Sequence, residues 1–308
     1  MKKRPIKKSR LLSRRFSHSK TLILGLAGLM VVIGSVAVAS FAQVPAGNPP
    51  AIAHRGGPAS FGLENVNSTF VKAAKAGYDI ELDVRFAKPN ANNLRTPWVL
   101  HDWALDRTTN CTGGLNSKTD AQLLKCKVSS TERIPTLYEA LTAIHNASPT
   151  ARVIIHVQPA DMRAVDALEV GKRVTWTSMQ SRSVVMSWLP EHLAYFKQYV
   201  PSLTRVRIFT KGTSWYSDPN AQRILPDISE LTPEAVAAAK AKGLAVYGSA
   251  DTPEGYIKLR QAGVIGNICD NPTAYDKWVR ANPIQPGTTP ATNFAQPPSD
   301  LRQPLPEG

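Results

Sequence analysis

The chain has 308 residues, of which 43% are hydrophobic and 19% charged, enough for one large globular domain or two small ones. Its formal charge of +14 would suit a nucleic-acid-binding protein, but nine of the 37 Lys and Arg residues lie within residues 1–20. Without that arm, 28 basic residues stand against 23 acidic ones, a balance of +5, so we expect no nucleic-acid partner.

The first 42 residues are typical of an export segment. A basic start is followed by Thr21–Ala42, 22 residues that carry no charge and end in small side chains. This pattern predicts a signal peptide cleaved near Ala39 or Ala42. The alternative is an uncleaved membrane anchor, because the uncharged run is long enough to span a bilayer. In both cases we expect the rest of the chain to be exported, periplasmic or extracellular, with membrane contact only through this segment.

The remaining chain is expected to form one barrel domain. Residues 43–50 form a predicted linker, and the Pro-rich residues 282–308 are expected to be disordered. Between them, residues 51–281 alternate short apolar runs with amphipathic helical ones, and this span is close to the roughly 250 residues of a (β/α)8 TIM barrel. The α/β alternation therefore predicts a closed parallel barrel.

The apolar runs predict eight barrel strands, at Ala51–His54, Asp79–Val84, Trp98–His101, Arg152–Gln158, Ser183–Trp188, Thr204–Phe209, Leu244–Tyr247 and Val264–Cys269. The helical periodicity predicts helices at Asn65–Ala76, Thr136–Asn146, Glu191–Tyr199, Pro233–Lys242 and Pro253–Ala262. Residues 211–231 show no clear pattern.

Two carboxylates lie late in the second predicted strand. Glu81 and Asp83 are two residues apart, so they share one face of the strand. Inside a barrel this face is buried, and two buried carboxylates are costly unless a cation compensates them. Oxygen ligands of this kind suit Mg²⁺ or Ca²⁺. The alternative is a half-exposed antiparallel strand whose acidic face is solvated.

A histidine ends each of the first and third predicted strands. His54 and His101 are suited to trade protons near neutral pH, so we expect them to act as an acid–base pair. Arg55 offers a planar fork that suits phosphate oxygens, although an ion pair with Glu64 or Asp270 would also explain it.

These residues lie in ordered motifs that resemble the glycerophosphodiester phosphodiesterase family. The matching motifs are Ile52-Ala53-His54-Arg55-Gly56, Glu64-Asn65, Ile80-Glu81-Leu82-Asp83-Val84, His101-Asp102, Leu105-Asp106-Arg107-Thr108-Thr109-Asn110, Ile134-Pro135-Thr136-Leu137 and Asp270-Asn271-Pro272. The resemblance implies a TIM barrel with a small insertion, here about residues 103–133, after the third strand. It also implies hydrolysis of a small-molecule phosphodiester, a glycerophosphodiester, to an alcohol and glycerol 3-phosphate.

The resemblance assigns roles by position. It implies that His54 and His101 are catalytic, that Arg55 binds the substrate phosphate, and that Glu81 and Asp83 hold one divalent metal ion, Mg²⁺ or Ca²⁺.

The fourth predicted strand departs from the family pattern. His156-Val157-Gln158 stands where the family usually has Glu-x-Lys. His156 is therefore the predicted third metal ligand, and an imidazole favours Mn²⁺ or Zn²⁺ over Ca²⁺.

Two other functions remain open. One is a phospholipase D-type enzyme on lysolipids or sphingomyelin, whose apolar ramp would be formed by Trp98, Trp103, Trp188 and Trp215. The other is a non-catalytic envelope binding protein on the same barrel.

The three cysteines fit an exported protein. Cys111 and Cys126 lie in one loop-like segment and could pair in an oxidising compartment. Cys269 lies in an apolar run, so we expect a buried, inert thiol.

Overall fold

The structure is a computed structural model that describes residues 47–158, 162–213 and 218–284. The predicted signal or anchor segment lies outside these residues, as does the tail beyond residue 284. Within the described ranges, no helix has both the length and the apolar character that a membrane crossing needs.

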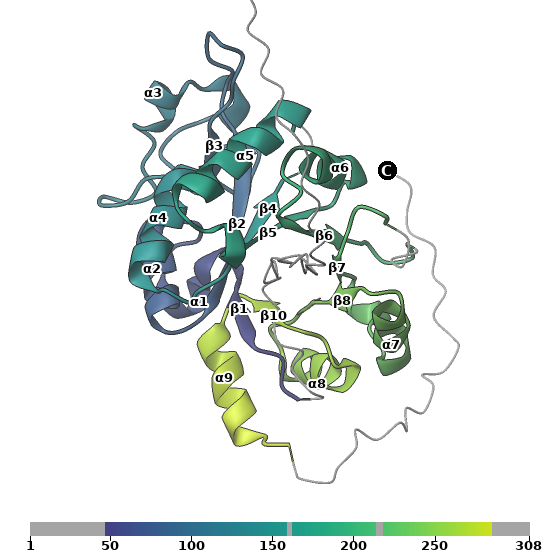
Figure 1. Cartoon of the computed structure of the whole chain (residues 1–308). Helices are drawn as coiled ribbons and strands as arrows, with labels where there is room; N and C mark the ends of the chain where they lie inside the picture. Colours follow the sequence, from purple (N-terminus) through teal and green to yellow (C-terminus); the bar gives the residue numbers. More distant parts are fainter. Residues whose placement is uncertain (1–46, 159–161, 214–217, 285–308) are drawn as a thin grey trace, which may run out of the picture. The chain divides into compact units, whose positions relative to one another are not determined.

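Parallel strands at the centre are surrounded by helices (Figure 1). The parallel strands of the described chain are β1 (Ala51–Ala53), β2 (Asp79–Phe86), β4 (Val153–Val157), β5 (Ser183–Ser187), β6 (Thr204–Ile208), β7 (Arg223–Leu225), β8 (Ala245–Val246), β9 (Gly248–Ser249) and β10 (Asn267–Cys269). Their hydrogen-bonded order is β8-β7-β6-β5-β4-β2-β1-β10-β9.

The barrel closes at a split strand. β8 pairs with β7 and β9 pairs with β10, and only Tyr247 separates β8 from β9. The two short strands are therefore halves of one barrel strand, and the described residues form a ring of eight. Gly248 permits this closure, because a Cβ atom there would lie 2.2 Å from the Leu259 side chain of the helix outside. The predicted (β/α)8 TIM barrel is confirmed.

Two details of the strand prediction are wrong. β3 (Pro97–Val99) is not a barrel strand, because it pairs antiparallel with the far end of β2. The ten-residue connection from 87 to 96 is too short for the helix that a parallel crossover needs, so the chain turns back as a hairpin. The true eighth strand is β7, whose three residues are too few to show a periodic pattern.

The helices are α1 (Pro58–Phe61), α2 (Asn67–Lys75), α3 (Asp120–Leu123), α4 (Leu137–Ala147), α5 (Ala164–Trp176), α6 (Pro190–Tyr199), α7 (Pro233–Ala241), α8 (Pro253–Ala262) and α9 (Pro272–Ala281). The five predicted helices are confirmed as α2, α4, α6, α7 and α8, to within a few residues. Their starts follow from capping chemistry. Before α4, the Thr136 hydroxyl accepts the N–H of Glu139, and the Glu139 carboxylate accepts the N–H of Thr136.

Strand β2 separates two environments. Ile80, Leu82 and Val84 join the core beneath the helices, while the alternate residues Glu81 and Asp83 point into the barrel. The same alternation on β4 sends Ile154 and His156 inward, next to Glu81 and Asp83 in register. The barrel interior therefore has an apolar layer beneath the charged groups that lie towards the carboxyl ends of the strands.

The insertion after His101 has a small core of its own. Leu105, Leu115 and Leu123 are fully buried there, together with Trp98 and Ile134. A short helix, η2 (Leu115–Ser117), and α3 frame this core. Cys111 and Cys126 form a disulfide across it, with their Cα atoms 5.4 Å apart. Cys269 is a buried free thiol, as expected.

The end of the predicted linker contacts the barrel. The carbonyl of Pro49 accepts the Tyr275 hydroxyl at 2.7 Å, and the carbonyl of Pro50 accepts the N–H of Asn267 at 2.9 Å. These hydrogen bonds hold the chain against the barrel immediately before β1 begins.

Candidate active site

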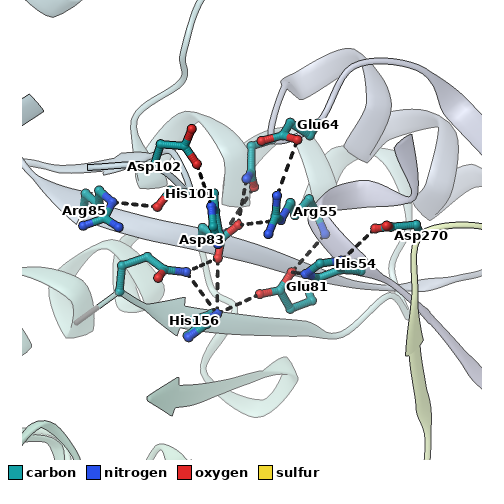
Figure 2. A network of polar contacts seen from close by, with 12 residues as sticks. His54, Arg55, Glu64, Glu81, Asp83, Arg85, His101, Asp102, His156 and Asp270 are labelled. Carbon is teal, nitrogen blue, oxygen red and sulfur yellow. Dashed lines mark hydrogen bonds and ion pairs between the residues drawn. The ribbon is translucent and has the colours of Figure 1, made fainter. Parts of the chain in front are cut away.

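Glu81 and Asp83 lie beside His156 inside the barrel (Figure 2). We call these three residues the carboxylate–imidazole cluster. His156 Nδ1 lies 3.4 Å from Glu81 Oε1 and 3.2 Å from Asp83 Oδ1. One ligand atom from each residue lies within 4.8 Å of the others, so the group could hold a metal ion. Both carboxylates are 0% exposed, which excludes the alternative of a solvated acidic face.

Asp83 is held by amides on both sides. The Asn65 side chain donates to Asp83 Oδ2 at 2.9 Å and accepts the Asp83 backbone N–H at 3.2 Å. Asn65 has a φ of +57°, a conformation that Asn adopts more readily than most residues. Gln158 donates its amide to Asp83 Oδ1. Burial would raise the pKa of Asp83, but the hydrogen bond and charge of His156 and the Asn65 bond hold it well below its usual range.

One carboxylate oxygen of Glu81 accepts no hydrogen bond from the described residues. Its Oε2 accepts the backbone N–H of Arg55 at 2.9 Å, which the left-handed turn at Arg55 (φ +51°) aims at it. Its Oε1 is buried and has no hydrogen-bond donor among the described residues. A buried carboxylate oxygen without a donor is costly unless a cation lies nearby. The cluster therefore fits a divalent metal ion.

His156 supplies positive charge to the metal-free cluster. Burial alone would lower the pKa of its imidazole, but the close carboxylates of Asp83 and Glu81 outweigh burial and raise it to about 9. The ring is therefore protonated at neutral pH while the cluster holds no metal. A bound cation would take over the charge compensation that this proton provides.

His54 lies at the end of β1, within reach of the cluster. Its Nε2 is 3.9 Å from Glu81 Oε2, and its Nδ1 is 2.7 Å from Asp270 Oδ1. Burial lowers the pKa of His54, but the Asp270 hydrogen bond and the charge of Glu81 raise it above the usual value overall. Sequence reasoning gave Asp270 no role towards His54, although its place after the last strand is the signal that could have indicated one.

His101 reaches the site from the β2–β3 hairpin instead of a barrel strand. Its Nδ1 lies 2.8 Å from Asp102 Oδ1, and its carbonyl accepts the Arg85 Nε–H at 2.7 Å. His54 and His101 therefore share one arrangement, an imidazole with a carboxylate at Nδ1.

Arg55 contacts carboxylates from two elements. Its Nη1 lies 3.5 Å from Glu64 Oε2, and its Nε lies 3.4 Å from Asp83 Oδ2. The ion-pair alternative is thus present with Glu64 and absent with Asp270, whose partner is His54. The guanidinium therefore lies next to the carboxylate–imidazole cluster.

A pocket of about 370 Å³ opens beside the cluster. Its polar end is formed by His54, Glu81 and His156. Its wall is mostly apolar and includes Met186, Trp188, Ile208, Phe209, Leu225 and Ile268. Lys211 and Asp227 also line it and add one charge of each sign.

Comparisons with known proteins point to one family. The profile of the "Glycerophosphoryl diester phosphodiesterase family" matches residues 54–274. Glycerophosphodiester phosphodiesterase 1 of Bos taurus is 34% identical over 160 residues, which cover 48% of this chain and 45% of the bovine protein. The Homo sapiens protein of the same name is 32% identical over 158 residues, with the same coverage. The chain thus spans about half the length of these relatives.

Solved structures share the barrel. A glycerophosphodiester phosphodiesterase from Agrobacterium tumefaciens superposes with a TM-score of 0.62 at 22% identity, covering 74% of this chain and 99% of that one. An Oleispira antarctica phosphodiesterase in complex with the product sn-glycerol-3-phosphate gives 0.62 at 20% identity, covering 75% and 97%. At these identities the likeness establishes the fold. Since the family profile covers nearly the whole barrel, the chain belongs to the glycerophosphoryl diester phosphodiesterase family.

Proposed function

We propose that the protein is a metal-dependent phosphodiesterase that hydrolyses glycerophosphodiesters to an alcohol and glycerol 3-phosphate. The observation that carries this proposal is the buried carboxylate–imidazole cluster at the polar end of the pocket, with His54 beside it. Membership of the family supports the reaction class, and the Oleispira antarctica enzyme holds the corresponding product.

Each group has a distinct role in the proposed reaction. Glu81, Asp83 and His156 would hold one divalent ion, which when bound polarises the non-bridging phosphate oxygens and stabilises charge in the transition state. Of His54 and His101, one takes the proton of the nucleophile and the other donates a proton to the leaving alkoxide. With water as the nucleophile this gives glycerol 3-phosphate directly, whereas attack by the glycerol hydroxyl of the substrate would give a cyclic phosphate that water then opens.

Orientation of these groups follows from their contacts. Each imidazole has a carboxylate at Nδ1, so each presents its Nε2 for proton transfer. Arg55 lies beside the cluster and would contact the phosphate, and its interaction with Glu64 holds it there until substrate binds.

We propose Mn²⁺ or Zn²⁺ as the preferred ion over Ca²⁺, with Mg²⁺ as a further candidate. An imidazole replaces a carboxylate in this cluster, which removes one negative charge and adds a softer ligand. A His156→Glu variant should move the preference towards Mg²⁺ and Ca²⁺. Unchanged metal preference in that variant would refute the ligand role of His156.

The primary test measures glycerol 3-phosphate release from glycerophosphocholine across Mg²⁺, Ca²⁺, Mn²⁺ and Zn²⁺. Glu81→Ala should lose both metal binding and turnover, and His54→Ala should lose turnover while retaining metal. His145→Ala, an exposed histidine of α4, is the control that should change neither. Full turnover by Glu81→Ala or His54→Ala would refute the role assigned to that residue.

The apolar pocket wall favours a second substrate class, diesters that carry an apolar group, such as lysolipids. Of the four tryptophans proposed for an apolar ramp, Trp188 lines the pocket. Trp98 is buried in the core of the insertion, and Trp103 is exposed and is not among the residues that line the pocket. Trp215 lies outside the described residues. Turnover of lysophosphatidylcholine in liposomes should be compared with that of soluble glycerophosphocholine. A protein that binds a divalent metal but turns over neither would instead be a non-catalytic envelope binding protein.

We also propose that the protein is exported. The basic arm with its uncharged run supports this, and so does the Cys111–Cys126 disulfide, since structural disulfides persist mainly in oxidising compartments. Fractionation of cells that express the full chain, with mass measurement of its N-terminus, tests export and separates a cleaved signal from an anchor. Recovery of the reduced protein in the cytoplasm would contradict this proposal.

A further inference from the structure

Arg107 bridges two carboxylates at the rim of the site. It comes from the insertion, and its Nε and Nη2 donate to Asp102 Oδ2 and Oδ1 at 2.5 and 3.0 Å. Its Nη2 and Nη1 also donate to Glu64 Oε1 and Oε2 at 2.6 and 3.1 Å. Figure 2 shows Glu64 and Asp102 on one side of the carboxylate–imidazole cluster. One guanidinium therefore engages all four oxygens of two carboxylates.

These contacts leave Asp102 one orientation. With both oxygens engaged by Arg107, the Asp102 carboxylate is fixed in its plane, and Oδ1 still lies 2.8 Å from His101 Nδ1. A carboxylate at this distance accepts the Nδ1–H, so the neutral imidazole is held with its proton on Nδ1 and Nε2 open. Without Arg107, Asp102 could rotate away and His101 would lose its fixed tautomer.

We propose that Arg107 is a positioning residue for the reaction: through Asp102 it sets the orientation and tautomer of His101, and through Glu64 it links His101 to Arg55. This inference rests on the proposed function of His101 in proton transfer. Arg107 acts through other residues and does not itself transfer a proton.

The insertion places Arg107 firmly. Leu105, just before it, is fully buried in the core of the insertion. Just after Arg107, the N–H of Thr109 donates to the carbonyl of Leu105 at 3.0 Å, and the Cys111–Cys126 disulfide closes the segment. The side chain is thus presented by a folded unit with a buried core and a disulfide.

The guanidinium shape is needed for this bridge. A planar fork can donate in parallel to two carboxylates, whereas the Lys ammonium is a single point of charge on a longer flexible stem. The hydrogen bond from Arg107, followed by that from His101, lowers the pKa of Asp102 to about 2, so its carboxylate stays charged while it orients the ring.

The test compares Arg107→Gln and Arg107→Lys with the matched control Arg133→Gln. Arg133 also belongs to the insertion and donates twice to one carboxylate, that of Glu139, but that pair lies at the start of α4. We expect Arg107→Gln to lower kcat roughly tenfold to hundredfold, as loss of a group that orients a reacting side chain usually does, with KM within about twofold. Arg107→Lys should recover only part of that loss, and Arg133→Gln should leave kcat unchanged.

A second readout does not depend on turnover. Nitrogen-15 NMR of the imidazole should show His101 as the Nδ1–H tautomer in the wild type and a mixture of tautomers in Arg107→Gln. Because Arg107 is half exposed, free guanidinium should restore activity to Arg107→Ala.

The kinetic constants and the tautomer of His101 together distinguish a positioning role of Arg107 from a substrate-binding or purely structural role. An unchanged tautomer, or a rise in KM with kcat intact, would overturn the positioning role, since Arg107 would then contact substrate or only stabilise the fold. A wild-type protein without phosphodiesterase activity would instead overturn the proposed function, while the tautomer measurement would still report on the bridge.

Discussion

Metal binding should expel one proton, from His156. In the metal-free cluster this imidazole lies against two buried carboxylates, and its pKa is raised to about 9. Only the deprotonated ring can bind a metal through Nδ1, so metal and proton compete for the same atom. Metal affinity should therefore rise with pH until about pH 9 and level off above it.

The pKa of His156 determines how strongly the metal affinity depends on pH. At pH 7 the ring lies about two units below its pKa of about 9, and each unit corresponds to 1.36 kcal/mol, so the competition costs about 2.7 kcal/mol. The metal affinity at pH 7 should thus be roughly a hundredfold weaker than its plateau well above pH 9, changing about tenfold per pH unit below the pKa.

Calorimetric titration with Mn²⁺ measures both the metal affinity and the number of protons released on binding. Repeating the titration at pH 7 in buffers with different heats of ionisation counts the protons released, which should be about one per bound ion. His156→Gln is the matched variant, since it keeps both carboxylates but removes the titrating ring. It should bind the ion without releasing a proton and with an affinity that varies little across this range. A wild-type affinity independent of pH, or equal proton release by the variant, would refute the reasoning.

Three further perturbations test the framework around the site. Gly56→Ala should destabilise the fold by more than Gly77→Ala: both residues have φ near +90°, but a Cβ atom at residue 56 would lie 2.9 Å from Phe70 while residue 77 has open space. Equal shifts in the denaturant midpoint would contradict this. Asn65→Ala should cost about 1–3 kcal/mol of stability and weaken metal binding, because a buried Asp83 oxygen loses its donor; an unchanged midpoint would argue against that bond. Reducing the disulfide of the insertion should remove up to about 3 kcal/mol of stability from that segment, seen as faster hydrogen exchange there; unchanged exchange would contradict the estimate.

The barrel could be predicted because its signals are local. Alternation along β2 separates Glu81 and Asp83 from the apolar residues between them, and each predicted helix has a clear periodic face or cap. β7 could not be found, because three residues within a segment without a clear pattern show no periodicity. β3 was misassigned because an apolar run does not reveal whether its partner is parallel or antiparallel.

The grouping of the candidate residues could be predicted from the sequence, whereas the contacts among them could not. A barrel gathers the ends of its strands, and this places His54 near both carboxylates, while His101 reaches them from the β2–β3 hairpin. The sequence could not show that Gln158 holds Asp83, that Asp270 pairs with His54, or that an arginine of the insertion spans two carboxylates. Those contacts depend on side-chain directions set by register and by the hairpin, which no spacing rule encodes.

Strand β2 continues without a break from the barrel into the hairpin. Residues 79–84 bond to β1 and β4 and include the cluster's carboxylates, and residues 84–86 bond to β3, which leads into the insertion. No break separates the two, so a force applied to the insertion would be transmitted along β2 to Glu81 and Asp83. For engineering, a fusion or label placed in the insertion would risk disturbing the carboxylate–imidazole cluster, whereas α7 and α8 pack against β8 and β9 on other parts of the barrel.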